Sequence, residues 1–192
     1  GKGDAWLGSA GASLDADLTP ELLKHAAFQE LVVREARSAG KLAHPNIVPV
    51  LDLGTNDRGE LFFTMPHVLG DTLTELIYSL ARGDADAHRK YGFSQRLHIM
   101  LKICEAVGHA HSFAILHRDL KPSNVMIGGH GEVLVMDWGL ALSLTADEPE
   151  NGRVVGTPGY MAPEQARGEN DRLDARTDVY GLGGVMYHLF AL

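Results

Sequence analysis

The stretch His117-Arg118-Asp119-Leu120-Lys121-Pro122-Ser123-Asn124 places an acid, a base and an amide within six residues. A loop can point all three side chains into one cleft. There a carboxylate can accept a hydroxyl proton, a lysine can neutralise phosphate oxygens, and an amide oxygen can hold a hard metal ion. The stretch therefore indicates chemistry on a phosphate ester, although its first three residues, taken alone, fit a solvated charged turn equally well.

A predicted helix and a predicted hairpin flank this stretch. Upstream, Ser94 is expected to cap a helix whose apolar residues follow the 3.6-residue period: Leu97, Met100, Leu101, Cys104, Val107 and His111. Downstream, the apolar runs 125–127 and 133–135 are separated by Gly128-Gly129-His130-Gly131, which suits a tight turn. The 117–124 loop is thus predicted to lie between a helix and a hairpin.

The chain before this region mixes one helix with strands. Thr19-Pro20-Glu21 is a helix-start signal, and the helix is expected to run to about Ala39 with Glu35 on an otherwise apolar face. Residues 47–51 and 61–65 are predicted strands, and residues 1–18 form a loose lead-in.

The remaining segments are expected to be helical or irregular. Residues 73–80 are a predicted short helix, and residues 82–92 are a predicted polar connection. Residues 139–176 are expected to be mostly loop. The last helix is predicted to start near Thr177 and is apolar on nearly every side, which is typical of a buried helix.

Composition indicates an ordinary globular protein and argues against two classes of partner. The chain has 192 residues, 45% of them hydrophobic and 22% charged, with a net charge of −8. This charge disfavours nucleic acid and anionic membranes. We find neither an apolar run of about 18 residues nor a secretory pattern at the start. Cys104 is the single cysteine, and the expected location is the cytoplasm.

Three further motifs follow the 117–124 loop along the chain. They are Asp137-Trp138-Gly139, then Gly156-Thr157-Pro158-Gly159-Tyr160-Met161-Ala162-Pro163-Glu164, then Asp178 at the start of the last helix. Together this series resembles the signature set of bacterial Hanks-type serine/threonine protein kinases, from about Leu22 to Leu192. The resemblance implies an α+β, two-lobe kinase fold. The small lobe would be reduced (residues 1–66), and the large lobe partial and mainly helical (residues 67–192).

The resemblance assigns roles to residues around the loop. Asp119 would be the catalytic base, Lys121 would steady the transferred phosphoryl group, and Thr157 would position both of them. Asn124 and Asp137 would hold Mg²⁺. Asp178 would brace the loop from below, and Trp138 stands where the family usually has phenylalanine.

The resemblance also suggests where ATP would bind. Glu35 stands ten residues before Pro45, as the family's C-helix glutamate does. Met65 would be the gatekeeper, and Pro66-His67-Val68 would form the hinge to the adenine. Met126, on the first hairpin strand, is grouped with Lys121, Asn124 and Asp137 among the residues that would contact the nucleotide or its metal.

Two simpler readings compete with these assignments. Glu35 alone fits an exposed helix charge. The three histidines His109, His111 and His117 admit a metal site, but His111 belongs to an apolar helix face and the resemblance implies that His117 packs inside the loop.

The sequence also departs from the family pattern. It shows no complete glycine-rich loop and no strand lysine, since Lys2 and Lys24 are the only lysines before Glu35. The first three strands of the small lobe are therefore expected to be missing. The last helix would be left partly uncovered, which favours self-association. Glu164 would lack the arginine that pairs with it in the family.

The implied activity is transfer of the ATP γ-phosphoryl group to serine or threonine hydroxyls of proteins, impaired by the missing lysine and glycines. The alternative is a catalytically inactive pseudokinase that serves as a binding or scaffold module.

Overall fold

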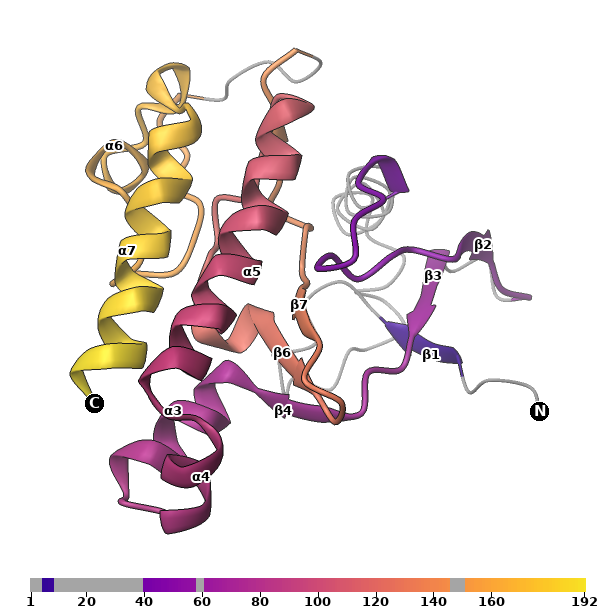
Figure 1. The fold of residues 1–192 in the computed structure, drawn as a ribbon. Coiled ribbons are helices and arrows are strands. Elements are labelled where there is room, and N and C mark those ends of the chain that lie inside the picture. The colour runs from indigo at the N-terminus through magenta and orange to yellow at the C-terminus, as the bar shows by residue number, and fades with distance from the viewer. Residues whose placement is uncertain (1–4, 9–39, 58–60, 146–150) are drawn as a thin grey trace.

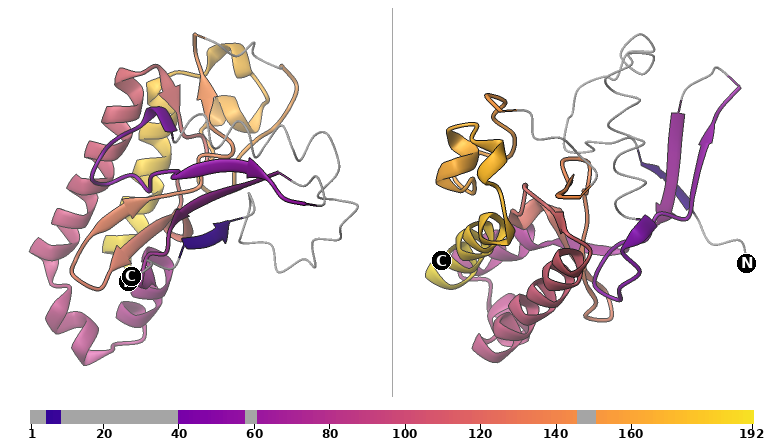
Figure 2. Two further views of the ribbon diagram at one scale, coloured as in Figure 1. Left: turned by 90° about the vertical axis from the view of Figure 1, so that its right-hand side faces the viewer. Right: turned by 90° about the horizontal axis from the view of Figure 1, so that it is seen from above.

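The computed structural model describes residues 5–8, 40–57, 61–145 and 151–192. It contains two three-stranded antiparallel sheets and a group of helices packed on one side of the second sheet (Figure 1). The two further views in Figure 2 show the first sheet standing apart from the long helices. This mixed arrangement agrees with the predicted α+β, kinase-like class. The predicted helix from Thr19 to Ala39, including Glu35, lies outside the described residues.

The first sheet has the strand order β1-β3-β2. Its strands are β1 (Ala5–Gly8), β2 (Asp52–Thr55) and β3 (Leu61–Pro66), and β3 pairs with both neighbours. The strand predicted at 61–65 is confirmed. The prediction of a loose lead-in is wrong at residues 5–8, because β1 adds a strand there, so the first sheet has three strands rather than two.

The strand predicted at 47–51 is also wrong. Only Ile47 forms an isolated bridge, to Val135, and the regular strand begins later, at Asp52. Pro49 lies in the middle of the predicted run and has no N–H to donate to a ladder. Leu51 still donates its N–H to the carbonyl of Thr64 at 2.7 Å, which leads the chain into the first sheet.

The second sheet has the order β4-β6-β7 and carries the predicted hairpin. Its strands are β4 (Gly70–Thr72), β6 (Val125–Gly128) and β7 (Val133–Val135). Gly70 pairs with Gly128, and a Cβ at Gly70 would lie 2.1 Å from the carbonyl oxygen of Ile127. Only glycine therefore allows β4 to approach β6 this closely. Residues 67–69 join the two sheets.

Three helices follow the second sheet's first strand. They are α3 (Leu73–Ala81), α4 (Ala85–Lys90) and α5 (Phe93–Ser112). The predicted helix at 73–80 is confirmed, with a capping box between Thr72 and Glu75. The connection at 82–92 is polar and exposed, as predicted, and it also contains helix α4, which starts where Asp84 accepts the N–H groups of Asp86 and Ala87. Helix α5 begins one residue before Ser94, with Gly92 at its N-cap.

The rest of the chain is mostly irregular up to the last helix, as predicted. Its short elements are β5 (Ile115–Leu116), η1 (Pro122–Asn124), β8 (Leu142–Ser143), α6 (Pro163–Ala166) and η2 (Asn170–Arg172). Helix α7 (Ala175–Ala191) starts two residues earlier than predicted, because Asp174 caps it by accepting the N–H of Arg176 at 2.8 Å.

The core lies between α5, α7, α3 and the second sheet. Helix α5 buries one face (Ile99, Met100, Ile103, Ala106, Val107 and Ala110), and α7 buries Val185 and Leu189 against it. Val179 and Met186 of α7 are more than half exposed. The expectation of a partly uncovered α7 is therefore confirmed, and self-association through it stays a prediction. Within the described ranges, the helices are too short or too polar to cross a bilayer.

Candidate active site

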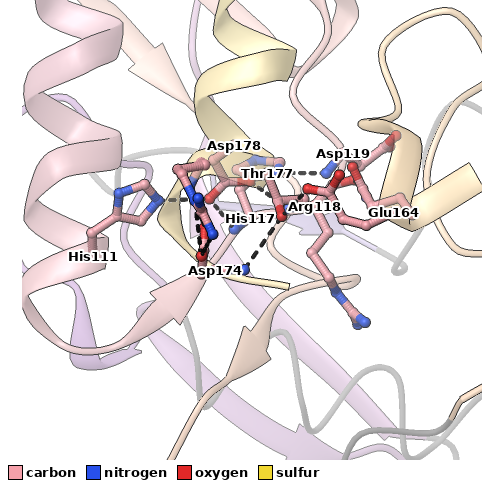
Figure 3. Close-up of polar contacts among 10 residues, drawn as sticks. His111, His117, Arg118, Asp119, Glu164, Asp174, Thr177 and Asp178 are labelled. Carbon is pink, nitrogen blue, oxygen red and sulfur yellow. Dashed lines mark hydrogen bonds and ion pairs between the residues drawn. The ribbon is translucent and has the colours of Figure 1, made fainter. Parts of the chain in front are cut away.

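The 117–124 loop is fixed from below by the buried carboxylate of Asp178 on α7. Its two oxygens accept the N–H of His117 at 2.8 Å and the N–H of Arg118 at 2.9 Å (Figure 3). His111 of α5 lies 2.8 Å from the same carboxylate through Nε2. The bracing contact expected of Asp178 is present. The role of His111 was missed, because its place on an apolar helix face suggested only packing.

Above this brace, Asp119, Lys121 and Thr157 form a closed triangle of polar contacts. Thr157 Oγ1 donates to Asp119 Oδ1 at 2.6 Å, and Lys121 Nζ donates to Thr157 Oγ1 at 2.9 Å. Lys121 Nζ also lies 2.8 Å from Asp119 Oδ2. Thr157 comes from a segment 38 residues away in sequence, so the fold itself brings together the three residues predicted to share the chemistry.

Asn124 and Asp137 lie next to this triangle. Asn124 donates through Nδ2 to the carbonyl of Asp119 at 2.9 Å, and that bond directs its side chain toward the base. The carbonyl of Asn124 accepts the N–H of Met136 at 3.0 Å, which places Asp137 one residue beyond the contact. Asp137 adopts a left-handed φ of 65°, a conformation that aspartate tolerates better than most residues. The amide of Asn124 and the carboxylate of Asp137 offer the oxygen ligands that Mg²⁺ requires.

His117 and Trp138 form the apolar floor behind the loop. Both are buried, and their ring centroids are 4.6 Å apart. The N–H of Asp119 points to His117 Nδ1 at 3.3 Å, and His117 Nε2 lies 3.2 Å from the carbonyl of Met136. Trp138 therefore fills a core position, as expected for a residue that replaces phenylalanine. Within the described part of the chain no cluster of histidines, cysteines and acids could hold a metal ion.

Arg118 has a strained backbone that is held on both sides. Its φ is 66°, its N–H is bound by Asp178, and its carbonyl accepts Gln165 Nε2 at 2.7 Å. Gly156 passes so close that an added Cβ would lie 2.8 Å from the Arg118 carbonyl oxygen. Gln165 was not singled out in the sequence, yet it ties the loop to the segment that carries Thr157.

The residues predicted to contact ATP lie on different parts of the structure. Met65 is half-buried at the end of β3, while His67 and Val68 lie on the segment that joins the two sheets. Met126 is half-buried on β6, and Asp137 follows the neighbouring strand β7. Glu35 lies outside the described residues. The role of these residues in binding ATP therefore stays a prediction.

Glu164 has a partner that the sequence did not suggest. Thr177 Oγ1 donates to Glu164 Oε1 at 2.8 Å, and the glutamate is only half-buried. Glu164 lines a cavity of about 340 Å³ together with Arg167, Arg172 and Arg176. The missing arginine partner stays a prediction, but the carboxylate is bound by a hydroxyl from the first turn of α7.

Comparison with known proteins identifies the class to which this fold and site belong. Residues 21–192 match the family model of the protein kinase domain. The chain therefore belongs to the protein kinase family.

Among its curated relatives are bacterial serine/threonine kinases. The chain is 37% identical to the serine/threonine-protein kinase PknD of Protochlamydia amoebophila (strain UWE25) over 194 residues. It is 41% identical to the probable serine/threonine-protein kinase CE0033 of Corynebacterium efficiens over 178 residues. Both alignments cover 90% of this chain, but only 20% and 26% of the relatives' own lengths.

Proposed function

We propose that this chain is part of a serine/threonine protein kinase and carries the groups that transfer the ATP γ-phosphoryl group to a protein hydroxyl. The observation that supports the proposal most strongly is the Asp119–Lys121–Thr157 triangle, beside two residues suited to Mg²⁺. In this proposal residues 1–66 belong to the small lobe and residues 67–192 to the large lobe, and the protein acts in the cytoplasm.

Asp119 is the proposed base. Its Oδ1 accepts the hydroxyl of Thr157, so the carboxylate is held in one orientation before a substrate arrives. In that position it can orient the acceptor serine or threonine and take its proton as the phosphoryl group moves. Such a base contributes about 10²–10⁴-fold to the rate.

Lys121 is the proposed neutraliser of the moving phosphoryl group. Its ammonium contacts both Asp119 Oδ2 and Thr157 Oγ1. A fixed positive charge there lowers the energy of the negatively charged transition state without reorganisation during the reaction.

Asn124 and Asp137 are the residues that would hold Mg²⁺. Once bound, the ion would neutralise charge on the phosphates of ATP. The hydrogen bond from Asn124 Nδ2 to the Asp119 carbonyl holds Asn124 next to the proposed base. Met65, His67, Val68 and Met126 are proposed to contact ATP, and Glu35 to act from the helix before them.

The test is transfer of labelled γ-phosphate from Mg²⁺–ATP to a generic protein acceptor. We expect Asp119→Asn, which keeps the side-chain shape, to lower transfer by about 10²–10⁴-fold. Asp86→Asn changes an exposed acid on α4 and should leave transfer as it is. Equal transfer by Asp119→Asn and the unchanged protein would refute the proposed role.

A second function is supported by one observation. The strand β1, which borders β3 in the first sheet, consists of Ala5-Trp6-Leu7-Gly8 and contains no lysine to grip the nucleotide. This favours a pseudokinase that binds a partner protein and does not transfer phosphate. Binding of Mg²⁺–ATP without transfer above the Asp119→Asn background, measured on the same preparations, would favour that alternative.

A further inference from the structure

Two imidazole rings meet where the His44-Pro45-Asn46 turn crosses α5. The ring of His44 stacks on the ring of His109 with centroids 4.9 Å apart and planes inclined by 30°. His109 also packs edge-on against Phe113, at 5.1 Å. Both histidines are half-buried. The pair therefore lies between the loop that leads to the first sheet and the long helix α5.

The hydrogen bond made by His44 requires a neutral ring. Its Nδ1 accepts the backbone N–H of Asn46 at 3.1 Å. A histidine nitrogen accepts a hydrogen bond only when it carries no proton. Protonation of Nδ1 would turn the acceptor into a donor and set two N–H groups against each other.

The same turn holds the loop to β7. Asn46 Nδ2 donates to the carbonyl of Val133 at 2.8 Å, and the carbonyl of Asn46 accepts the N–H of Val135 at 2.8 Å. The N–H of Val48 donates to the carbonyl of Val135 at 3.1 Å. Asp137 lies two residues further along the chain. Any release of the turn therefore removes contacts from the strand that leads to Asp137.

The charges around His44 favour its neutral form. Burial lowers the pKa of His44, the neighbouring His109 and Lys102 lower it further, and Glu105 opposes them. Glu105 also interacts with other basic groups. Lys102 donates a hydrogen bond to it at 2.8 Å, and His98 interacts with it electrostatically. The Nε2 atom of His109 is buried, and within the described residues it has no hydrogen-bond partner. A charge on the His44 ring would thus be poorly solvated.

We propose that the His44–His109 pair is a proton-sensitive clamp, which fastens the turn 44–48 to α5 and β7 while the His44 ring is neutral. Protonation of His44 breaks the bond to the Asn46 N–H and places a positive charge against His109. The turn then separates from β7, and the first sheet is held less firmly to the rest. This inference does not depend on phosphoryl transfer.

The direction of the pH effect follows from the lowered pKa. An unfolded or released histidine takes up its proton near pH 6.5, whereas the clamped His44 takes it up only at lower pH. The clamped state is therefore fully favoured above about pH 6.5 and loses stability as the pH falls from there toward the pKa of the clamped ring.

Hydrogen exchange of the backbone amides of Val48 and Val135 tests the clamp. After correction for the intrinsic pH dependence of exchange, we expect protection to fall by up to about tenfold per pH unit below pH 6.5. The variant His44→Asn keeps an acceptor for the Asn46 N–H, in an Asx turn, but does not titrate in this range. Its protection should not show this fall, while His130→Asn, on the exposed hairpin turn, should behave like the unchanged protein.

An NMR titration of the unchanged protein provides the second measurement and does not rely on the variants folding. A pKa of His44 below that of a free histidine supports the clamp. A pKa at or above the free value would overturn it, as would equal pH dependence of protection in His44→Asn and the unchanged protein.

Discussion

The 117–124 loop and the first sheet are held together by different kinds of contact. The loop is nearly buried, and side chains from distant segments, among them Asp178, Gln165 and Thr157, bind its backbone or its acid. The first sheet is held mainly by its own backbone ladder, and Leu51 and Leu53 near its edge are exposed. The loop is therefore held by contacts with several helical segments. The first sheet is held to the rest of the protein mainly by the segments that precede β2 and follow β3.

This difference also separates two groups of residues that are proposed to form the site. The acid, the lysine and the threonine of the triangle contact one another directly. Met65 lies near the end of β3, and His67 and Val68 lie on the connection between the sheets. A change in the residues that support the loop should therefore lower the stability of the whole fold. A change in the connection should lower the stability of the first sheet only.

Removing the buried acid should have the largest effect. Asp178→Ala leaves the buried N–H groups of His117 and Arg118 without their acceptor, and we expect it to lower the free energy of unfolding by about 3–5 kcal/mol. Asp174→Ala is the matched control one turn earlier on α7, where an N-cap and an exposed ion pair with Arg176 are lost, at about 1 kcal/mol. Chemical denaturation measures both. Similar losses in the two variants would show that the loop does not depend on Asp178.

An intermediate effect is expected where β4 meets β6. Gly70→Ala would place a Cβ 2.1 Å from the carbonyl oxygen of Ile127, so β4 must move away, which we expect to lower stability by about 1–3 kcal/mol. At Gly129 the nearest atom to such a Cβ is 3.8 Å away, and Gly129→Ala should change stability by less than about 1 kcal/mol. If denaturation curves of the two variants coincide, the close approach of the strands is not a constraint.

The smallest effect concerns activity and depends on the proposed function. Thr157→Val removes the hydroxyl that joins Lys121 to Asp119, and we expect transfer to fall about tenfold, equivalent to about 1.4 kcal/mol in the barrier. Thr157→Ser keeps the hydroxyl and should retain most of the activity. Steady-state rates of both variants, taken beside their melting temperatures, distinguish lost positioning from lost folding.

The elements that were predicted correctly are those specified by short sequence patterns. The hairpin after Asn124 follows from two apolar runs around a glycine-rich turn, and the short helix predicted at 73–80 is present as α3. The order of the polar motifs predicted that Asp119, Asn124 and Asp137 lie close together, because the hairpin brings them to one edge.

What the sequence did not reveal depends on contacts between distant segments. The pairs His111–Asp178 and Thr177–Glu164 join residues 67 and 13 positions apart, and neither pair has a local pattern. The start of α5 was placed at Ser94 because serine is a good cap, but the chain uses the backbone of Gly92. At Pro49 the apolar run was read as a strand although proline interrupts a ladder.

The position of Asp178 also determines when the loop can become ordered during synthesis. The acid that binds the His117 N–H follows it by 61 residues. At about 5–20 residues per second, a ribosome needs about 3–12 s to add them. During that interval the nascent loop lacks its brace, so the last helix must emerge before the phosphoryl-transfer groups can take up their final arrangement.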